Sequence, residues 1–394
     1  MIWKPHSPEI QLMLALARYL SEGDAADEIE PLLQQPLDWR RFEECCVRHE
    51  LYPLVHRTLE RLQLPSVPSE LTSRLGSAAA ENEIKALQLY AGLLRISRVF
   101  AEAGVRALPL KGPALALQIF GDIGLRRSLD LDFFVSLDDL PKAGDALLQE
   151  GYARAAEEEG LTPRQRRHLV RSTSHSVFRH ASRKYWLDLH WKLDHHDRFR
   201  LDFVSAWERA VPLEADQDTL MMLSPEDTIH YLAFHGTKHK WFQLKWLVDL
   251  DACMRQDPGP RTEALVARAE ELKTEDVLGQ ALIILRKHLQ TPVPEALQER
   301  FARRPKAKRL AEAVGAFMFR ENIQGVGRFR KLRDLSWHVR LYGLRRFLVG
   351  QYLLPDSRLY RRIPLPDSLH GLYYVINPFF RLWILLRCAF RRGG

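Results

Sequence analysis

Residues 108–135 read LPLKGPALALQIFGDIGLRRSLDLDFFV, and this stretch decides the fold of the chain. The run VRALPL at 105–110 is short and apolar, and a Gly-Pro pair ends it, which predicts a strand. ALALQIFGD at 114–122 predicts a short helix. DLDFFV at 130–135 begins with alternating polar and apolar residues, as expected of a strand with one buried face. The stretch therefore predicts a strand, a helix and a second strand, with a Gly/Arg/Ser loop before the last.

Two further runs have the composition of strands. SHSVFRH at 174–180 and YWLDLHWKL at 185–193 are separated by a short polar stretch that is typical of a hairpin turn. LPKAGDALLQEGY at 140–152 predicts a helix, and residues 162–172 predict a loop or the start of a helix. The order strand, helix, strand, helix, strand, strand predicts an α+β fold: a small mixed β-sheet with helices on one face.

Helical periodicity dominates the rest of the chain. Apolar residues recur at helical spacing in an N-terminal helical segment, and from Ser224, a predicted N-cap, a C-terminal helical domain follows. We therefore predict four regions: an N-terminal helical region at 1–103, an α/β core at 104–220, a helical region completing the site at 221–300, and a basic helical tail at 301–394.

The composition is that of a globular protein with an uneven charge distribution. The 394 residues are 46% hydrophobic, which is enough for a sizeable core. Residues 300–394 contain 21 Lys and Arg against 5 Asp and Glu, so a basic tail follows an acidic body. The apolar stretch near the N-terminus is too short for a secretory signal, and the four cysteines form no CxxC pair and are expected to be reduced. These features predict a cytoplasmic protein.

Asp130 and Asp132 form the first candidate site. Residues two apart on a strand project to the same side, so the two carboxylates should lie about 7 Å apart along the chain. Burying two like charges is costly unless a cation compensates, and Mg²⁺ or Mn²⁺ prefers carboxylate and phosphate oxygens. If the strands at 130–135 and 185–193 are neighbours, Asp188 completes a triad that binds metal or deprotonates an attacking hydroxyl. Without such context, a pair of aspartates is more often an ordinary strand end.

A predicted phosphate-binding element precedes the aspartates. Lys111 and Gly112 end one strand and lead into a helix, which places a lysine and backbone N–H groups where phosphate can bind. In the loop that follows this helix, Arg126 or Arg127 can neutralise the charge of a transferred phosphate. The alternative is that both arginines are ordinary solvated loop charges.

Taken together, these motifs resemble those of the uncharacterised nucleotidyltransferase family within the DNA polymerase beta superfamily. Seventeen residues separate the run LKG from DLDFFV, and LDLHWKL at 187–193 and HGTKHKWFQLKWLVDL at 235–250 follow in the order of the family's pattern. The helical lead-in WRRFEECCVRHELYPLVHRTL at 39–59 is also similar. The similarity spans roughly residues 35–255.

The resemblance implies an enzyme that moves a nucleoside monophosphate from an NTP to a hydroxyl-bearing acceptor. It implies that Asp130, Asp132 and Asp188 are catalytic residues and ligands of Mg²⁺ or Mn²⁺. It also implies a set of nucleotide contacts: Lys111, Gly112, Arg126 and Ser128. The chain departs from better-known superfamily members, which have a Gly-Ser pair closer to the aspartates, because here Gly112 lies 18 residues before Asp130. The acceptor is a metabolite, sugar, peptide or protein, and similar proteins suggest natural-product or surface-polysaccharide biosynthesis.

Histidines near these motifs suggest further contacts and a rival metal chemistry. A zinc hydrolase is one alternative, because the run DHHD at 194–197 follows His190 closely, but this run has the character of a solvated turn. His235 and His239 share a helix face, yet the chain reads HGTKH and lacks the glutamate of an HExxH motif. We instead predict substrate or phosphate contacts from His190, His235, Lys238, His239 and Asp249. Core packing and surface charge are the alternative for these residues.

The C-terminal run INPFFRLWILLRCAFRR at 376–392 predicts a short amphipathic helix. One side collects its arginines: Arg381, Arg387, Arg391 and Arg392. Such a helix can contact an anionic membrane surface or another polyanion, or it can dock on the protein's own body, which we favour. Nucleic acid is not a predicted partner, because the sequence has no recognisable RNA-binding motif.

A second hypothesis is a non-catalytic protein that binds nucleotide or membrane through a degenerate nucleotidyltransferase fold. The presence of three aspartates argues against it, because an idle site has no physical reason to hold repelling carboxylates together.

Overall fold

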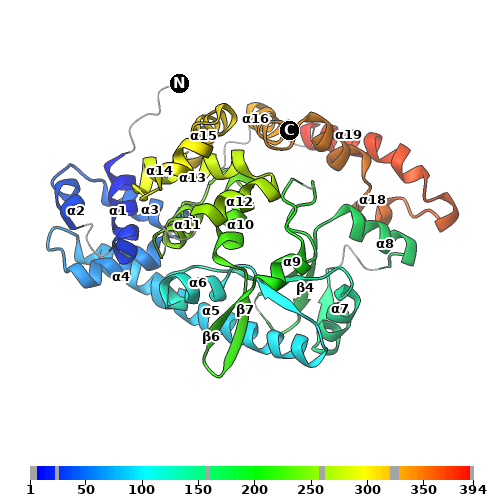
Figure 1. The fold of residues 1–394 in the computed structure, drawn as a ribbon, viewed down its shortest axis with the longest axis horizontal. Helices are drawn as coiled ribbons and strands as arrows, with labels where there is room; N and C mark the ends of the chain where they lie inside the picture. The colour runs from blue at the N-terminus through cyan, green and yellow to red at the C-terminus, as the bar shows by residue number, and fades with distance from the viewer. Residues whose placement is uncertain are drawn as a thin grey trace.

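The structure is a computed structural model that describes residues 7–22, 26–155, 160–183, 185–196, 198–256, 262–319 and 328–390. Its fold is α+β, as the sequence predicts: a mixed sheet of five strands lies among helices that precede and follow it (Figure 1). Among the helices described, none combines the length and the apolar character that crossing a bilayer requires.

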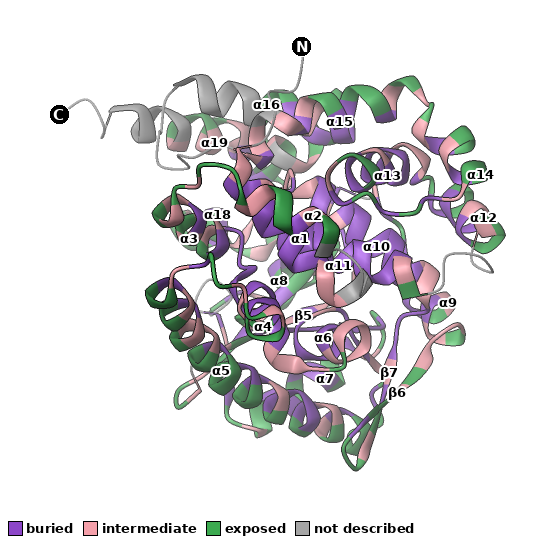
Figure 2. Cartoon of the chain, turned by 90° about the vertical axis from the view of Figure 1, so that its left-hand side faces the viewer, coloured by how far each residue is buried: buried purple, intermediate pink, exposed green. Residues whose placement is uncertain are grey.

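Five helices precede the sheet. They are α1 (Pro8–Glu22), α2 (Ala26–Leu33), α3 (Trp39–Arg48), α4 (Tyr52–Leu62) and α5 (Ser69–Glu102). Helix α3 begins where the side chain of Asp38 accepts a hydrogen bond from the backbone N–H of Arg41, an N-cap that satisfies a free donor of the first turn. Helix α5 is 34 residues long and runs along the sheet, with a largely exposed outer face (Figure 2).

The sheet has the strand order β1-β2-β5-β4-β3. Its strands are β1 (Ala107–Pro109), β2 (Asp130–Val135), β3 (Tyr152–Arg154), β4 (His175–His180) and β5 (Trp186–His190). Strands β2 and β5 are parallel, and the other neighbours are antiparallel, including the predicted β4–β5 hairpin. The connecting helices are α6 (Pro113–Phe120), α7 (Leu140–Gln149) and α8 (Pro163–Ser172), with a 3-10 turn at Ile123–Leu125. The strand β3 was not predicted, because three residues are too few to show a period.

The two faces of the sheet have different characters, and β2 shows why. Leu131, Phe133 and Val135 are buried in a core that the sheet shares with α5 and α7. Because side chains alternate along a strand, Asp130 and Asp132 lie on the opposite face. That face is covered by helices that come later in the chain, so helices lie on both sides of the sheet rather than on one.

The chain after β5 is mostly helical, as predicted. Its elements are α9 (Phe203–Glu208), β6 (Val211–Ala215), β7 (Asp218–Met222), α10 (Pro225–Lys238), α11 (Lys245–Gln256), α12 (Thr262–Leu272), α13 (Glu275–Leu289), α14 (Glu295–Leu297), a π-helical turn (Gln298–Ala302), α15 (Pro305–Met318), α16 (Arg328–Tyr342), α17 (Leu344–Leu348), a second π-helical turn (Val349–Leu353), α18 (Ser357–Arg362), a 3-10 turn (Asp367–Leu369) and α19 (Leu372–Phe390). Ser224 caps α10 by accepting a hydrogen bond from the N–H of Asp227, which confirms the predicted N-cap. The β6–β7 hairpin was missed, because its acidic residues weaken the strand pattern.

The helices before and after the sheet share one hydrophobic core. Leu12 and Leu16 of α1 are fully buried in the same cluster as Leu247 of α11 and Leu282 of α13. Figure 2 shows this buried zone where α1, α10, α11 and α13 meet. The N-terminal helices therefore hold α10 and α11 in position above the sheet.

The packing of α13 depends on a glycine. A Cβ at Gly279 would lie 2.3 Å from the carbonyl oxygen of Phe301, which is far inside van der Waals contact. We expect Gly279→Ala to lower the free energy of unfolding by about 1–3 kcal/mol, because the backbone of the π-helical turn must move away. The control is Gly371→Ala, where a Cβ would meet nothing within 4 Å. Urea unfolding of both variants measures the effect, and equal midpoints would contradict this account of the packing.

Candidate active site

Two aspartates lie side by side on the parallel strands β2 and β5. The register pairs Asp132 with Asp188, and Leu131 with Leu187, so the leucines enter the core while both acids share the other face. The two strands are therefore neighbours, which is the condition under which Asp188 joins the other aspartates. Because β2 lies between β1 and β5, the carboxylates stand on a face of the sheet and not at its edge.

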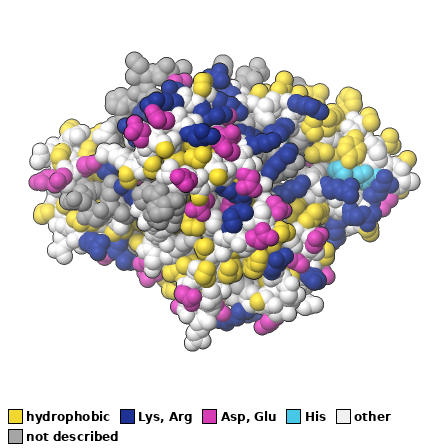
Figure 3. Space-filling model, in the orientation of Figure 1, with side chains coloured by type: hydrophobic (Ala, Val, Ile, Leu, Met, Phe, Trp, Pro, Cys, Tyr) yellow, Lys and Arg dark blue, Asp and Glu magenta, His cyan; other side chains and the backbone are white. Residues whose placement is uncertain are grey.

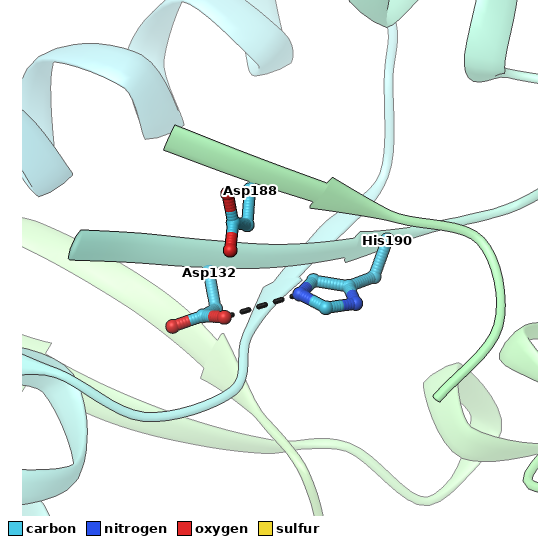
Figure 4. A group of neighbouring side chains, drawn as sticks. All are labelled: Asp132, Asp188 and His190. Carbon is cyan, nitrogen blue, oxygen red and sulfur yellow. Dashed lines mark hydrogen bonds and ion pairs between the residues drawn. The ribbon is translucent and has the colours of Figure 1, made fainter. Parts of the chain in front are cut away.

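A third potential ligand joins this pair. Atoms of Asp132, Asp188 and His190 that can bind a metal all lie within 4.8 Å of one another (Figure 4). The Nε2 atom of His190 is 3.1 Å from Oδ1 of Asp132. The Oδ1 atom of Asp188 is buried and has no hydrogen-bond partner among the described residues. An unpartnered carboxylate oxygen beside a second carboxylate and an imidazole fits a divalent cation.

Lys111 lies against the aspartates. Its Nζ atom is 2.9 Å from Oδ2 of Asp132 and 3.7 Å from Oδ2 of Asp130. The next residue, Gly112, has a φ of 74°, which favours glycine, and this turn directs the chain from β1 into α6. The predicted phosphate-binding lysine thus forms ion pairs with the predicted metal ligands.

The carboxyl groups of the site have divergent proton affinities. Burial favours the neutral form of Asp132, but Lys111 and His190 outweigh it and hold the pKa of Asp132 well below its usual range. Burial, together with the charges of Asp132 and Asp130, raises the pKa of Asp188 to about 7. Burial and Asp132 also raise the pKa of Asp130. The site therefore concentrates more negative charge than Lys111 balances, which is the electrostatic condition for binding a cation.

Arg126 is held by a buried ion pair. Its guanidinium lies 3.0 Å from Oδ2 of Asp249 on α11, and its Nη1 donates a hydrogen bond of 2.9 Å to Oγ of Ser128. The neighbouring Arg127 pairs with Glu50, which also pairs with Lys245. These contacts tie the loop before β2 to α11 and to the turn after α3.

The carboxylates open into a cavity of about 400 Å³ between the sheet and the helices α10 and α11. Ten of the twelve predicted site residues line it: Lys111, Arg126, Ser128, Asp130, Asp132, Asp188, His190, His235, Lys238 and His239. The other two, Gly112 and Asp249, shape its wall from behind through the turn and the ion pair described above.

The helical wall of the cavity is aromatic and basic. The rings of His235 and His239 lie 4.7 Å apart and both contact the indole of Trp246. Burial lowers the pKa of His235 far below its usual value and that of His239 to about 3, so both imidazoles are neutral near pH 7. Burial also lowers the pKa of Lys238, and no carboxylate of the described residues lies within ion-pair distance of it.

Several lining residues were not predicted: Glu50, Ser174, His175, Trp186, Tyr231 and Lys245. His175 stacks on His190 with ring centres 4.9 Å apart, because the β4–β5 register pairs these two residues. The register of the predicted hairpin could have identified His175 as a site residue, because it pairs His175 with His190. Glu50 and Lys245 are far from the other site residues in the sequence, and no local sequence pattern predicts that they line the cavity.

The two histidines of the DHHD run, His195 and His196, do not line the cavity. The rings of His195 and His196 lie 3.8 Å apart, and His196 packs on Tyr342. The carboxylate of Asp194 accepts a hydrogen bond from the backbone N–H of Arg198, and Asp197 lies outside the described residues. The group of potential metal ligands found within the described ranges is the one on β2 and β5.

The mixed sheet thus carries carboxylates on neighbouring strands that face a cavity lined by both acidic and basic side chains. The sequence profile described as uncharacterised nucleotidyltransferase matches residues 35–290. The chain therefore belongs to this family, as the motif resemblance predicts. A search of curated proteins and a search of solved structures found no match.

The buried pair of Arg126 and Asp249 should stabilise the site strongly. We expect Asp249→Ala to lower the free energy of unfolding by about 3–5 kcal/mol, because it leaves a buried guanidinium unpaired. The matched control is Glu44→Ala, which removes the partner of Arg40 from a pair whose side chains are 89% and 67% exposed, and which should cost less than about 0.5 kcal/mol. Urea unfolding of both variants and the wild type measures the two losses in the free energy of unfolding. A loss for Asp249→Ala as small as the control's would show that the pair is not structural.

Proposed function

We propose that the protein is a Mg²⁺- or Mn²⁺-dependent enzyme that transfers a nucleoside monophosphate from an NTP to a hydroxyl group. The observation that carries this proposal is the register pair of Asp132 and Asp188, at the base of a cavity whose opposite wall is basic. An NTP carries several negative charges that need both a metal and basic side chains, and this cavity provides places for both.

Asp132 and Asp188 are the proposed metal ligands, with Asp130 and His190 beside them. A bound divalent ion would neutralise phosphate charge and orient the triphosphate. In the proposed transfer, the acceptor oxygen forms a bond to the α-phosphorus while the bond to the bridging oxygen breaks and pyrophosphate leaves. Asp188 stands where it can serve either as a ligand or as the base that takes the proton of the hydroxyl.

Lys238 is the proposed anchor of the phosphates. Four lysines and arginines line the cavity: Lys111, Arg126, Lys238 and Lys245. Lys111, Arg126 and Lys245 each pair with a carboxylate. Within the described part of the chain Lys238 has no carboxylate at ion-pair distance, so an anionic ligand could form a direct ion pair with this half-buried ammonium.

The neutral imidazoles of His235 and His239 lie on the same wall as Lys238 and can donate N–H groups to phosphate or acceptor oxygens. We propose that the nucleotide fills the part of the cavity between the aspartates and α10. The acceptor, which we propose to be a metabolite, sugar, peptide or protein, then approaches from the open side. Natural-product or surface-polysaccharide biosynthesis is the proposed context.

The metal requirement can be tested by calorimetry. We expect one or more of ATP, GTP, CTP and UTP to bind the wild-type protein with Mg²⁺ and to bind at least roughly tenfold more weakly without it. Asp132→Asn and Asp188→Asn should weaken binding by a similar factor, because each removes a ligand charge. The control is Asp218→Asn on β7, whose carboxylate pairs with the exposed Arg98 of α5 and does not line the cavity. If the affinity for nucleotide is the same with and without Mg²⁺, and the same in both site variants as in the wild type, the proposal is refuted.

The role of Lys238 has its own test. We expect Lys238→Ala to raise the dissociation constant of the Mg²⁺–NTP complex by roughly tenfold or more, because it removes a charge-assisted hydrogen bond of about 1.5–3 kcal/mol. Lys238→Arg should restore part of the affinity, and Lys85→Ala on the exposed face of α5 should change nothing. Titration calorimetry measures the dissociation constant of the Mg²⁺–NTP complex for each of these three variants. An unchanged affinity in Lys238→Ala, with the protein folded, would contradict a phosphate contact.

A further inference from the structure

The helix α19 exposes an apolar face. Its outward side chains are Leu372, Val375, Phe379, Leu382 and Trp383. At 100° per residue they fall within an arc of about 100°. Phe379 is 70% exposed and Val375 is 62% exposed, which is unusual for side chains of this size.

The opposite face of α19 holds the helix on the protein. Tyr373 and Asn377 are buried, and the Asn377 side chain donates hydrogen bonds of 2.9 Å to the carbonyl oxygens of Tyr352 and Leu354. Arg381 pairs with Asp356 at 3.0 Å and is largely buried. The helix thus docks, as favoured from the sequence, but through the side that carries Arg381, and it leaves its apolar side open. Arg391 and Arg392 lie outside the described residues, as does the side chain of Arg387.

The exposed apolar residues concentrate in this part of the molecule. Of the 21 exposed large hydrophobic side chains among the described residues, 12 belong to residues 335–383. Single exposed apolar residues are normal, whereas a contiguous group of them indicates a surface that binds another protein or a membrane.

Arginines flank the apolar face on both sides. On one side, Arg164, Arg167 and Arg171 are exposed along one side of α8, whose His168 contacts Tyr374 of α19. In the described part of the chain, Arg167 and Arg171 have no carboxylate partner. Figure 3 shows Lys and Arg side chains gathered around histidine, beside hydrophobic groups, at the end of the molecule where Figure 1 places α8 and α19.

On the other side of the face, the guanidinium of Arg362 lies over the ring of Trp383, 6.0 Å from its centre. The nearby carboxylates are already engaged. Asp356 pairs with Arg358 and Arg381, and Asp367 accepts a hydrogen bond from the hydroxyl of Thr162. The flanks are therefore positively charged.

We propose that this surface, formed by α8, α18 and the apolar face of α19, binds an anionic lipid bilayer. The helix α19 would lie in the plane of the interface, with Val375, Phe379 and Leu382 in the apolar boundary and the flanking arginines at lipid phosphates. A second copy of the chain fits less well, because a twofold contact through this face would bring the arginine-rich flanks together. This inference is independent of the proposed nucleotide chemistry.

The test is co-sedimentation of the full-length protein with vesicles of phosphatidylcholine alone or mixed with phosphatidylglycerol. We expect the wild type to bind the anionic vesicles, and to bind the neutral ones and the anionic ones at high salt more weakly. The double variant Val375→Ser/Phe379→Ser should reduce the partition coefficient about tenfold or more, because it removes the apolar part of the contact. The matched control is Ile84→Ser/Leu87→Ser, which removes two apolar side chains of similar exposure from α5 and should bind like the wild type.

Arg167→Ala/Arg171→Ala should reduce binding to anionic vesicles without changing binding to neutral ones, since it removes only charge. Three results would overturn the proposal: no binding of the wild type to anionic vesicles, equal loss in both double serine variants, or binding that depends on the arginines alone. Light scattering on the same samples tests the alternative that a second copy of the chain covers this face. A wild-type dimer that does not bind vesicles, and that dissociates in Val375→Ser/Phe379→Ser, would assign the face to a second copy.

Discussion

The carboxylates of Asp132 and Asp188 stand opposite each other on neighbouring parallel strands, and their repulsion constrains everything around them. Lys111 compensates part of the charge, and Gly112 directly after it has a φ of 74° where the chain turns from β1 into α6. Arg126 and Arg127 are paired with Asp249 and Glu50, so neither forms an ion pair with the site carboxylates. Burial of Asp188, together with the charges of Asp132 and Asp130 that Lys111 only partly offsets, raises the pKa of Asp188 to about 7.

The helical parts of the chain position the second half of the cavity. The N-terminal helices pack with α11 and α13 in one core, and Glu50 pairs with Lys245 at the start of α11. The buried ion pair of Arg126 and Asp249 links the same helix to the loop before β2. The result is a cavity with carboxylates on the sheet at its base and Lys238, beside two neutral histidines, on its helical wall. Both walls rest on packed elements, which is how a protein holds charged groups within hydrogen-bonding distance of a ligand.

Much of this arrangement was predictable, because it depends on local pattern. The alternation in DLDFFV predicts two carboxylates on one face, and the sequence identifies Asp188 on a second strand. That these two strands are neighbours was a condition of the prediction, which the structure meets. The pairing of Lys111 with Asp132, the partners of Arg126 and the free ammonium of Lys238 were not predictable, because each depends on which distant residue packs opposite. The face of α19 that packs on the protein was also not predictable. The helical pattern separates arginines from apolar residues, but it does not determine which of the two faces packs.

The central claim is that Asp132 and Asp188 support nucleotidyl transfer. The most direct measurement incubates the protein and Mg²⁺ with NTPs labelled at the α-phosphate, in an extract that supplies acceptors, and follows the label into product. The account predicts a labelled acceptor with the wild-type protein and none with Asp132→Asn or Asp188→Asn. Equal labelling by the wild type and both variants, or label that appears only when it is placed on the γ-phosphate, would contradict it.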